Sequence, residues 1–235
     1  MVKKERGEAS TFDFAVGAHG TTNARVYRAK DPIDATFIIG HGAGAPQSHP
    51  FMIGMAHRLA RRGIDVVTFD FLYMLAGRKL PDRTAVLEAT WHAAIASVRA
   101  RTGFASTRLF IGGKSMGGRI ATHVAAADTS LRLSGLVLLG YPLHPIDKPK
   151  VRRDEHLPRV PFRMLFVQGS RDELGNEKEM RALVKTLPHA TLHVVKGGDH
   201  SLALPKKEGA DAQELALEGA ADAIVAFVKR ARRPA

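Results

Sequence analysis

The chain has 235 residues, of which 45% are hydrophobic, and it contains no cysteine. These values exclude general disorder, disulfides, cysteine-ligated metals and a thiol nucleophile, so nucleophilic chemistry falls to a hydroxyl, an amine or a carboxylate. Lysine and arginine outnumber aspartate and glutamate by 35 to 23, a formal net charge of +12. The basic residues lie in short scattered groups without interleaved aromatic residues, so we expect a solvated basic surface and disfavour nucleic-acid binding.

The sequence also lacks several targeting and cofactor signals. No stretch approaches the ~20 consecutive apolar residues of a membrane-spanning helix, and the first residues lead into no apolar run typical of a secretory signal. We therefore expect a soluble, cytoplasmic protein. Histidine and aspartate never combine at a recognised metal-ligand spacing, so we expect neither a metal nor a cofactor.

Short apolar runs rich in β-branched residues alternate with amphipathic stretches. This alternation predicts an α/β fold with a mostly parallel central sheet and helices on both faces. The strands are expected at residues 12–16, 24–28, 36–40, 64–69, 108–111, 136–139, 164–167 and 191–195. Helical spacing of apolar residues recurs over 87–98 and 217–228, and the last helix is expected to start at Asp211 and end in the basic residues Lys229, Arg230, Arg232 and Arg233.

Residues 141–161 interrupt this alternation with five of the twelve prolines, mixed charges and little periodicity. Such a segment is typical of a surface excursion, and we expect a short lid there. Residues 1–10 and 231–235 offer no apolar face for docking and are expected to be mobile tails. The sequence shows no domain boundary, so we expect a single domain over residues 1–235.

The most informative stretch covers residues 109–121, where an apolar strand leads into glycines, one serine, further glycines and a helical pattern. Gly113, Ser115 and Gly117 form a G-x-S-x-G sequence, which a nucleophile elbow requires because small residues must flank a serine on a strained strand-to-helix turn. A helix that begins at this serine places the Met116 N–H where an oxyanion forms. The pattern predicts Ser115 as a nucleophile.

A glycine-rich phosphate loop is the alternative interpretation of the same stretch. A loop of the form G-x-x-x-x-G-K-[ST] that ends at Ser115 requires glycine at position 108, where the chain has Arg108. The turn is also too short to form a backbone cradle for a phosphate. Nucleotide hydrolysis is therefore disfavoured, and Lys114 is expected to be an elbow residue with its ammonium near the cleft.

A serine hydroxyl needs an imidazole to accept its proton and a carboxylate to orient that imidazole. His200 is the best candidate among eleven histidines, because it lies on a glycine-rich loop between the last strand and the final helix. Most of the others lie within helical patterns, a strand or ordinary loops, where a histidine is usually structural or solvated: His19, His57, His92, His123, His144, His156, His189 and His193.

For the carboxylate we choose Asp172, which follows the strand that precedes the histidine strand. Glu173 lies one residue further out and remains an alternative, whereas Asp199 would have to fold back to reach the adjacent imidazole. Asp70 and Asp128 are weaker candidates. The chosen serine, acid and histidine all follow predicted strands, where open α/β sheets place their sites, and they occur in the chain order of nucleophile-elbow enzymes.

A glycine-rich turn at residues 40–46, after an early strand, supplies the fourth element. Such a turn aims a backbone N–H inward, and the N–H of Ala43, or alternatively of Gly42, would complete an oxyanion hole with that of Met116. Each such donor is typically worth ~3 kcal/mol of transition-state stabilisation. His41 is expected to shape this turn, because His200 is better placed to act as the base.

Together these residues resemble the α/β-hydrolase superfamily over nearly the whole chain. They are similar to a branch often described as dienelactone-hydrolase-like, which includes a subunit of the non-specific-lethal histone acetyltransferase complex; the matching segments are HGAGAP (41–46), FDFLYM (69–74), GGKSMGGR (112–119), GYPLHP (140–145), QGSRDELG (168–175) and GGDHS (197–201). The resemblance implies an α/β-hydrolase fold with a short lid and a catalytic triad of Ser115, Asp172 and His200. Dienelactone hydrolases use a cysteine nucleophile, so the name of the branch does not imply that activity for a chain with Ser115.

We therefore expect a serine hydrolase, carboxylesterase-like or thioesterase-like, that cleaves an ester, thioester or related acyl bond of a small molecule through an acyl-enzyme. An apolar wall of its pocket is expected from Phe51, Met52, Tyr73 and Met74, and Lys114 or the arginines of the lid segment are expected to favour anionic substrates. The alternative hypothesis is a non-catalytic scaffold that binds a protein or polyanion. It is motivated by the charge of +12 and by family members that serve as complex subunits.

Overall fold

The computed structural model describes residues 9–104 and 107–231. It contains all eight expected strands: β1 (Ser10–Ala15), β2 (Thr21–Tyr27), β3 (Ala35–Gly40), β4 (Asp65–Phe69), β5 (Arg108–Lys114), β6 (Gly135–Leu139), β7 (Met164–Gly169) and β8 (Ala190–Val195). The largest difference at a carboxyl end is in β5, which continues beyond the predicted end at residue 111. Gly112 and Gly113 still pair with β3 and β6, although glycine has little strand propensity of its own.

The described residues also form six α-helices: α1 (Pro50–Arg61), α2 (Leu72–Leu75), α3 (Thr84–Arg99), α4 (Met116–Ala127), α5 (Glu177–Lys185) and α6 (Gly209–Arg230). Short 3-10 helices occur at Gly17–His19, Leu157–Arg159 and Lys206–Glu208. The last helix, α6, starts two residues before the predicted Asp211 and ends at Arg230. Arg232 and Arg233, which we expected at its end, lie outside the described residues.

The eight strands form one sheet in the order β1-β2-β4-β3-β5-β6-β7-β8. β1 pairs antiparallel with β2, and β2 pairs antiparallel with β4, whereas all neighbouring strands from β4 to β8 are parallel. The carboxyl ends of β3, β5, β7 and β8 therefore lie at one edge. The chain runs from β3 to β4 on one side and then to β5 on the other, which creates the switch point where open α/β sheets bind ligands.

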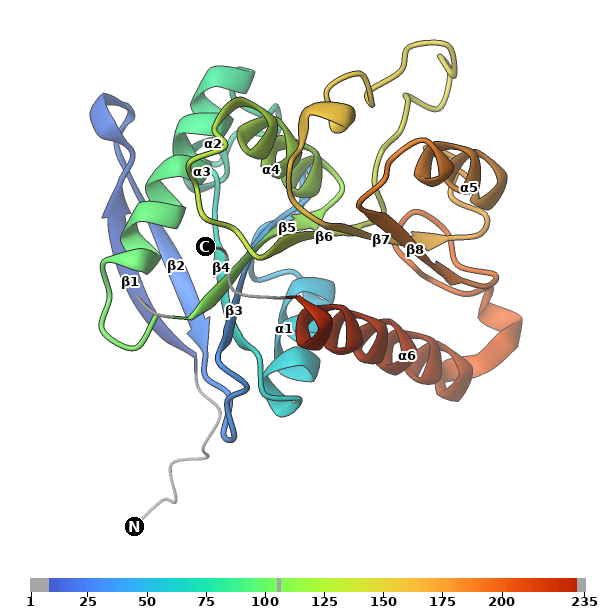
Figure 1. Cartoon of the computed structure of the whole chain (residues 1–235), viewed down its shortest axis with the longest axis horizontal. Coiled ribbons are helices and arrows are strands. Elements are labelled where there is room, and N and C mark those ends of the chain that lie inside the picture. Colours follow the sequence, from blue (N-terminus) through green and yellow to red (C-terminus); the bar gives the residue numbers. More distant parts are fainter. Residues whose placement is uncertain (1–8, 105–106, 232–235) are drawn as a thin grey trace.

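Helices cover both faces of the sheet, as expected (Figure 1). α1 and α6 lie on one face, whereas α3, α4 and α5 lie on the other. Each face has its own apolar cluster: Ile39 and Phe110 belong to the cluster with α1 and α6, and Ile38 and Ile111 to the cluster with α3 and α4. Successive residues of the central strands point to opposite buried faces, which explains why these strands are almost wholly apolar.

The predicted tails are shorter than expected where the structure describes them. Ser10 pairs with Val26 in the β1–β2 ladder, and Ala231 is buried with its carbonyl oxygen accepting a hydrogen bond from Arg108. Backbone pairing holds Ser10 in the fold, whereas Ala231 also packs in the apolar cluster with α1 and α6, an apolar contact that the sequence did not predict. The remainder of the predicted tails at residues 1–8 and 232–235 lies outside the described residues.

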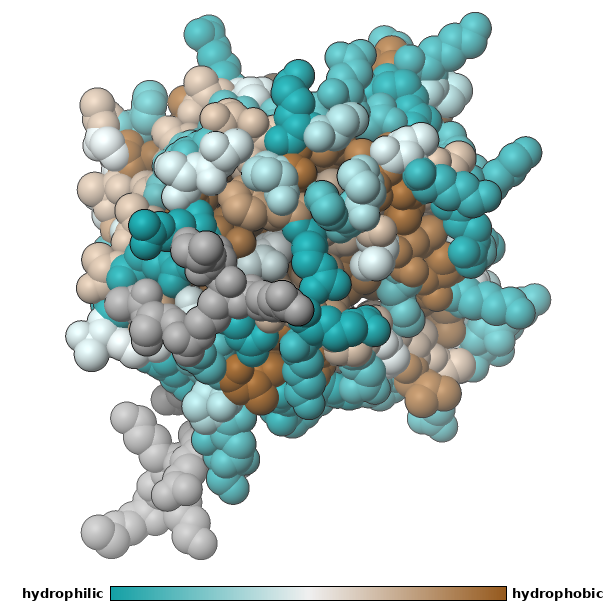
Figure 2. All heavy atoms as spheres, in the orientation of Figure 1, coloured by the Kyte–Doolittle hydropathy of each residue, from teal (hydrophilic) through white to brown (hydrophobic). Residues whose placement is uncertain are grey.

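The surface carries mainly hydrophilic side chains on the face shown in Figure 2, with hydrophobic residues in patches between them. The large exposed hydrophobic residues are dispersed along the chain: Leu75, Leu80, Ile146, Val151 and Leu215. Among the described residues, no helix combines the length and hydropathy needed to span a bilayer.

Candidate active site

Ser115 lies on a tight turn between β5 and α4, with backbone angles φ +49° and ψ −114°. A positive φ is uncommon outside glycine and costs of order 1–3 kcal/mol. The Ser115 N–H donates to the Leu139 carbonyl oxygen at 2.9 Å, and its carbonyl oxygen accepts from the Arg119 N–H at 3.0 Å. These bonds hold the strained residue between β6 and the first turn of α4.

The glycines on both sides of Ser115 allow β3 to approach the turn closely. A Cβ atom at Gly113 or Gly117 would overlap the carbonyl oxygen of Gly40. Trp91 of α3 supports the same place, because its Nε1 donates to the Gly117 carbonyl oxygen at 3.2 Å. The G-x-S-x-G pattern therefore reflects packing against β3 as well as the conformation of the turn.

The structure brings together the serine, the histidine and the acid chosen from the sequence. His200 Nε2 is 2.8 Å from Ser115 Oγ, and His200 Nδ1 is 2.9 Å from Asp172 Oδ2. The Asp172 side chain is fully buried, and that of His200 is 27% exposed. A carboxylate only accepts hydrogen bonds, so the ring carries its hydrogen on Nδ1 and Nε2 accepts the hydrogen of the serine hydroxyl.

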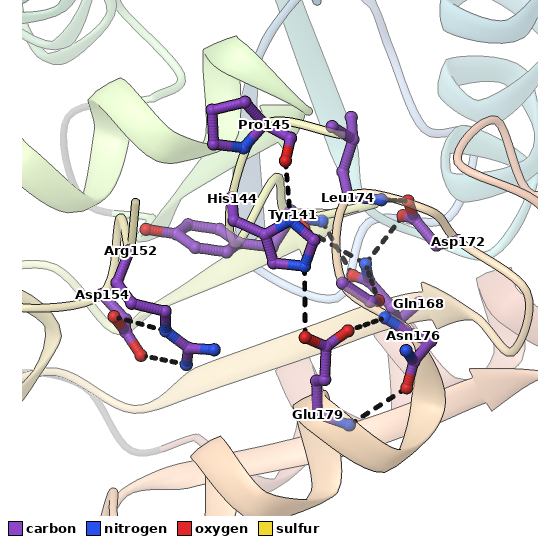
Figure 3. A network of polar contacts seen from close by, with 11 residues as sticks. Tyr141, His144, Pro145, Arg152, Asp154, Gln168, Asp172, Leu174, Asn176 and Glu179 are labelled. Carbon is purple, nitrogen blue, oxygen red and sulfur yellow. Dashed lines mark hydrogen bonds and ion pairs between the residues drawn. The ribbon is translucent and has the colours of Figure 1, made fainter. Parts of the chain in front are cut away.

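Two further donors hold Asp172 in place (Figure 3). Gln168 Nε2 donates to Asp172 Oδ2 at 2.7 Å, and the Leu174 N–H donates to Oδ1 at 2.8 Å. Gln168 lies in β7, and its amide also bonds the Tyr141 N–H, the Tyr141 carbonyl oxygen and the Gly175 carbonyl oxygen. Gln168 is not among the site residues predicted from the sequence, where its signal is a single amide side chain in an otherwise apolar strand.

The loop that carries Asp172 is also tied to α5 and to the proline-rich segment (Figure 3). Asn176 and Glu179 form a reciprocal capping box at the start of α5. Glu179 Oε1 lies 3.2 Å from Nε2 of His144, whose Nδ1 lies 2.9 Å from the Pro145 carbonyl oxygen. Part of the segment at residues 141–161 therefore holds the start of α5, and with it the loop that carries Asp172, which we call the acid loop.

The other candidate carboxylates do not contact the His200 ring. They are exposed or hydrogen-bonded elsewhere: Glu173, Asp199, Asp70 and Asp128. Asp199 Oδ1 accepts the N–H groups of Ser201 and Ala203, which shapes the loop that carries His200. Across the described part of the chain, no group of three or more histidine, aspartate or glutamate side chains is arranged to hold a metal ion.

The glycine-rich turn after β3 packs directly against the elbow. A Cβ atom at Gly42 would lie 3.6 Å from Ser115 Cβ, and Ala43 lines the cavity beside the serine. Met116 is the first residue of α4, so its N–H has no partner inside the helix. The structure therefore places Ala43 and Met116, the two residues expected to form the oxyanion hole, next to the serine.

His41 is fully buried under this turn. Its Nδ1 lies 2.7 Å from the Gly42 carbonyl oxygen, and its Nε2 accepts the Phe71 N–H at 3.1 Å. Burial lowers the pKa of His41 and outweighs the opposing effects of the Gly42 hydrogen bond and the Asp70 charge. A neutral His41 thus joins the turn to the loop after β4, the arrangement expected of a residue that shapes the turn.

A cavity of about 210 Å³ opens beside Ser115. Its walls come from the loops after β3, β5 and β8 and from the start of α1: Gly42, Ala43, Ala45, His49, Phe51, Met52, Lys114, Ser115, His200 and Ser201. Phe51 and Met52 provide the expected apolar wall, whereas Tyr73 and Met74 do not line it. Tyr73 is instead buried in the core, where its ring stacks on that of Phe71.

The segment at residues 141–161, all of which the structure describes, contributes no residue to the walls of this cavity. Its middle is exposed at Ile146 and Val151, but Tyr141 and Leu157 are buried against the rest of the fold. The segment therefore forms the expected excursion, drawn in yellow in Figure 1, without forming a lid over this cavity.

Lys114 lines the cavity, as expected of an elbow residue near the cleft. Burial lowers the pKa of its ammonium to about 8, although the charges of Asp172 and Asp199 act in the opposite direction. Of the basic residues expected to favour anionic substrates, Lys114 reaches the cavity and the arginines of residues 141–161 do not.

Comparison with known proteins identifies the family. Residues 33–229 match the family model described as an alpha/beta hydrolase domain. One similar solved structure is a dienelactone hydrolase from Anabaena variabilis, with 17% identity and a TM-score of 0.75 over 97% of this chain and 100% of that chain. Another is XC6422 from Xanthomonas campestris, described as an α/β serine hydrolase without lid, with 20% identity and a TM-score of 0.73 over 95% of this chain and 94% of that chain. Est1E from Butyrivibrio proteoclasticus is also similar, with 14% identity and a TM-score of 0.71 over 95% of this chain and 100% of that chain. The chain belongs to the alpha/beta hydrolase family, and the fold expected from the sequence is confirmed.

Proposed function

We propose that this protein is a serine hydrolase that cleaves an ester, thioester or related acyl bond of a small molecule, with Ser115, His200 and Asp172 as its catalytic triad. The observation that carries the proposal is the chain of hydrogen bonds from Ser115 Oγ through both ring nitrogens of His200 to a fully buried carboxylate. A strained serine, an oriented imidazole and a buried acid are the groups that nucleophilic acyl transfer requires. Family membership, and the named activities of proteins with similar folds, support the same class.

The geometry suits a two-step acyl transfer. His200 Nε2 removes the hydroxyl proton while Ser115 Oγ bonds to the acyl carbon, and the hydrogen bond from Nδ1 to Asp172 stabilises the imidazolium. The negative charge formed on the acyl oxygen faces the N–H groups of Ala43 and Met116. The tetrahedral intermediate then expels the alcohol or thiol, which takes the proton from Nε2. Water repeats the sequence, releases the acid and restores the serine.

The first experiment asks whether Ser115 is the nucleophile. An active-site-directed fluorophosphonate is expected to label wild-type protein at Ser115, and turnover of nitrophenyl esters is expected to fall by up to roughly a millionfold in Ser115→Ala. Ser201→Ala is the matched control, because this second serine lines the same cavity, whereas the ring nitrogens of His200 bond to Ser115 and Asp172. Labelling that persists in Ser115→Ala, or that is lost in Ser201→Ala alone, contradicts the assignment.

The second experiment asks which carboxylate orients His200. Asp172→Asn is expected to lower kcat by about 10⁴-fold, because the amide no longer selects the ring tautomer with hydrogen on Nδ1. Glu173→Gln changes the exposed neighbour in the same way and is expected to leave kcat within a few-fold. Equal losses of kcat in the two variants would mean that Asp172 is not the carboxylate that orients His200, which would contradict the proposed triad.

A non-catalytic scaffold that binds a protein or polyanion is the second candidate, favoured by the net charge of +12. Such a scaffold would show no fluorophosphonate labelling and would be retained on heparin in a manner that weakens steeply with salt. If Ser115 is labelled and the protein turns over esters, the serine hydrolase is favoured over the scaffold.

A further inference from the structure

Lys114 immediately precedes the elbow serine and lines the cavity beside it. Its Cγ lies close to Gly42 on the β3 side, where a built Cβ would be 3.5 Å away. Its Nζ lies on the β6 side, since a Cβ built at Gly140 would be 3.2 Å from Nζ and 3.5 Å from His200 Nδ1. The ammonium is therefore next to the histidine of the proposed triad.

No carboxylate in the described part of the chain forms a hydrogen bond or ion pair with Lys114. The two whose charges reach it, Asp172 and Asp199, are engaged with other groups. Asp172 accepts from His200, Gln168 and a backbone N–H, and Asp199 accepts two backbone N–H groups of its own loop. The charge of the lysine is thus not neutralised by direct contact with any carboxylate that the structure describes.

Lys114 is one of the residues that line the cavity. Its walls contain no aspartate or glutamate; the polar side chains besides Lys114 are His49, His200 and the two serines, and the apolar ones include Phe51 and Met52. Its volume of about 210 Å³ is below the ~300–1,000 Å³ typical of pockets for drug-sized ligands. A short chain with a polar end fits these walls better than a long alkyl chain.

We propose that this cavity takes a short acyl chain bearing a carboxylate, and that the Lys114 ammonium binds this carboxylate while Ser115 attacks the acyl carbon. This inference rests on the proposed function, because it assigns a substrate class to the same site. A partly buried ammonium without a counter-ion is unfavourable, and a bound carboxylate would offset that cost with a charge-assisted hydrogen bond. The net charge of +12 also attracts anionic substrates at long range.

Matched substrates test the proposal directly. The half-esters ethyl hydrogen succinate, glutarate and adipate are each compared with the ethyl ester in which a primary amide replaces the carboxylate, so size and reactivity are conserved while the charge is removed. At pH 7, wild-type protein is expected to hydrolyse at least one half-ester with a kcat/KM about 10-fold or more above that of its amide, the range of a charge-assisted contact.

Three variants locate the source of this preference. In Lys114→Met the ratio of acid to amide kcat/KM is expected to fall to about 1, and in Lys114→Arg, which keeps the charge, most of it is expected to remain. Lys185→Met removes the same charge from an exposed position on α5 and is expected to leave the ratio unchanged. Circular dichroism and thermal unfolding establish that each variant is folded.

Ligand binding to Ser115→Ala provides a readout that needs no turnover. Titration calorimetry of this variant is expected to show tighter binding of the preferred half-ester than of its amide, and the difference is expected to disappear in Ser115→Ala/Lys114→Met. Ester hydrolysis without preference for any acid, or a preference that survives Lys114→Met, overturns the inference and leaves the hydrolase proposal standing. Anion-selective binding without hydrolysis or fluorophosphonate labelling supports the anion site and overturns the hydrolase instead. If the protein shows neither ester hydrolysis nor anion-selective binding, both the hydrolase proposal and the anion site are overturned.

Discussion

Gln168 Nε2 lies 2.7 Å from Asp172 Oδ2, the same oxygen that accepts the hydrogen of His200 Nδ1. The other carboxylate oxygen accepts the Leu174 N–H. With both oxygens held, the Asp172 carboxylate cannot rotate without breaking several buried hydrogen bonds. The orientation of the histidine is therefore set by an amide in β7 as well as by the acid itself.

Replacing Gln168 with leucine is expected to lower kcat/KM by roughly 10- to 100-fold, the range seen when a group that orients a ligating or catalytic residue is removed. It is also expected to lower the free energy of unfolding by about 1–3 kcal/mol, because the buried Tyr141 N–H and Gly175 carbonyl lose their partner. Ester kinetics and urea unfolding measure the two effects. A folded leucine variant with wild-type kcat would show that Gln168 does not position the acid.

The packing of the elbow gives a prediction of stability with an internal control. Gly117→Ala is expected to destabilise the fold by about 1–3 kcal/mol, because the added methyl overlaps the Gly40 carbonyl oxygen and the backbone must move. Gly219→Ala makes the same chemical change in α6, where nothing lies within 4 Å of the new methyl, and is expected to stabilise by about 0.5–1 kcal/mol. Urea unfolding that shows the same sign for both substitutions would contradict this account of the elbow.

The parts of the fold that sequence predicts best are those in which each residue's neighbours in the chain decide its environment. The apolar run that leads into Gly113 and Ser115 already contains the strand, the turn and the start of the helix, so the elbow follows from local pattern. The parallel order of β3, β5, β7 and β8 then brings the loops with Ala43, Asp172 and His200 to the same edge.

Contacts between segments far apart in the chain are what the sequence does not specify. In the sequence Gln168 is one polar residue in an apolar strand, and its hydrogen bonds with Tyr141, 27 residues earlier, are visible only in the folded chain. Tyr73, expected in the pocket wall, is buried in the core, where its ring lies 6.0 Å from that of His41 in a distant loop. Residues 141–161 were expected to form a lid, but buried anchors such as His144 hold the segment against the acid loop.

The pH dependence of substrate preference follows from the state of Lys114. Burial lowers the pKa of its ammonium to about 8, and Asp172 and Asp199 partly oppose this shift. A lysine binds an anion only while protonated, so the ratio of acid to amide kcat/KM is expected to be high at pH 7 and to decline as pH rises above about 8. Under the proposed mechanism both substrates use His200 and Ser115 in the same way, so titration of the base cancels in the ratio. A ratio that stays constant from pH 7 to pH 10 would exclude Lys114 as the anion-binding group.

A group of ion pairs joins α1 to α6 and leads to a prediction about acid stability. Glu218 of α6 pairs at 2.5 Å with Arg62, the residue that follows the last residue of α1, and also contacts Arg58 and Arg61 within α1. Partial burial raises the pKa of Glu218, but the hydrogen bond and charge of Arg62 and the charge of Arg58 outweigh it, so the pKa lies below its ordinary value of 4.5. The stabilisation from a carboxyl of lowered pKa is complete above the unfolded value and is lost as pH falls through the folded one.

Glu218→Gln is accordingly expected to lower the free energy of unfolding at pH 7 by up to about 1 kcal/mol, and this difference from wild type should shrink as pH falls below about 4.5 and as salt is added. Glu177→Gln removes an i,i+4 partner of Arg181 within α5 alone and is expected to cost about 0.3–0.5 kcal/mol. Thermal unfolding of the three proteins across this pH range provides the measurement. A Glu218→Gln deficit that is the same at pH 3 and pH 7 would mean that packing between α1 and α6, and not the charge of Glu218, stabilises their contact.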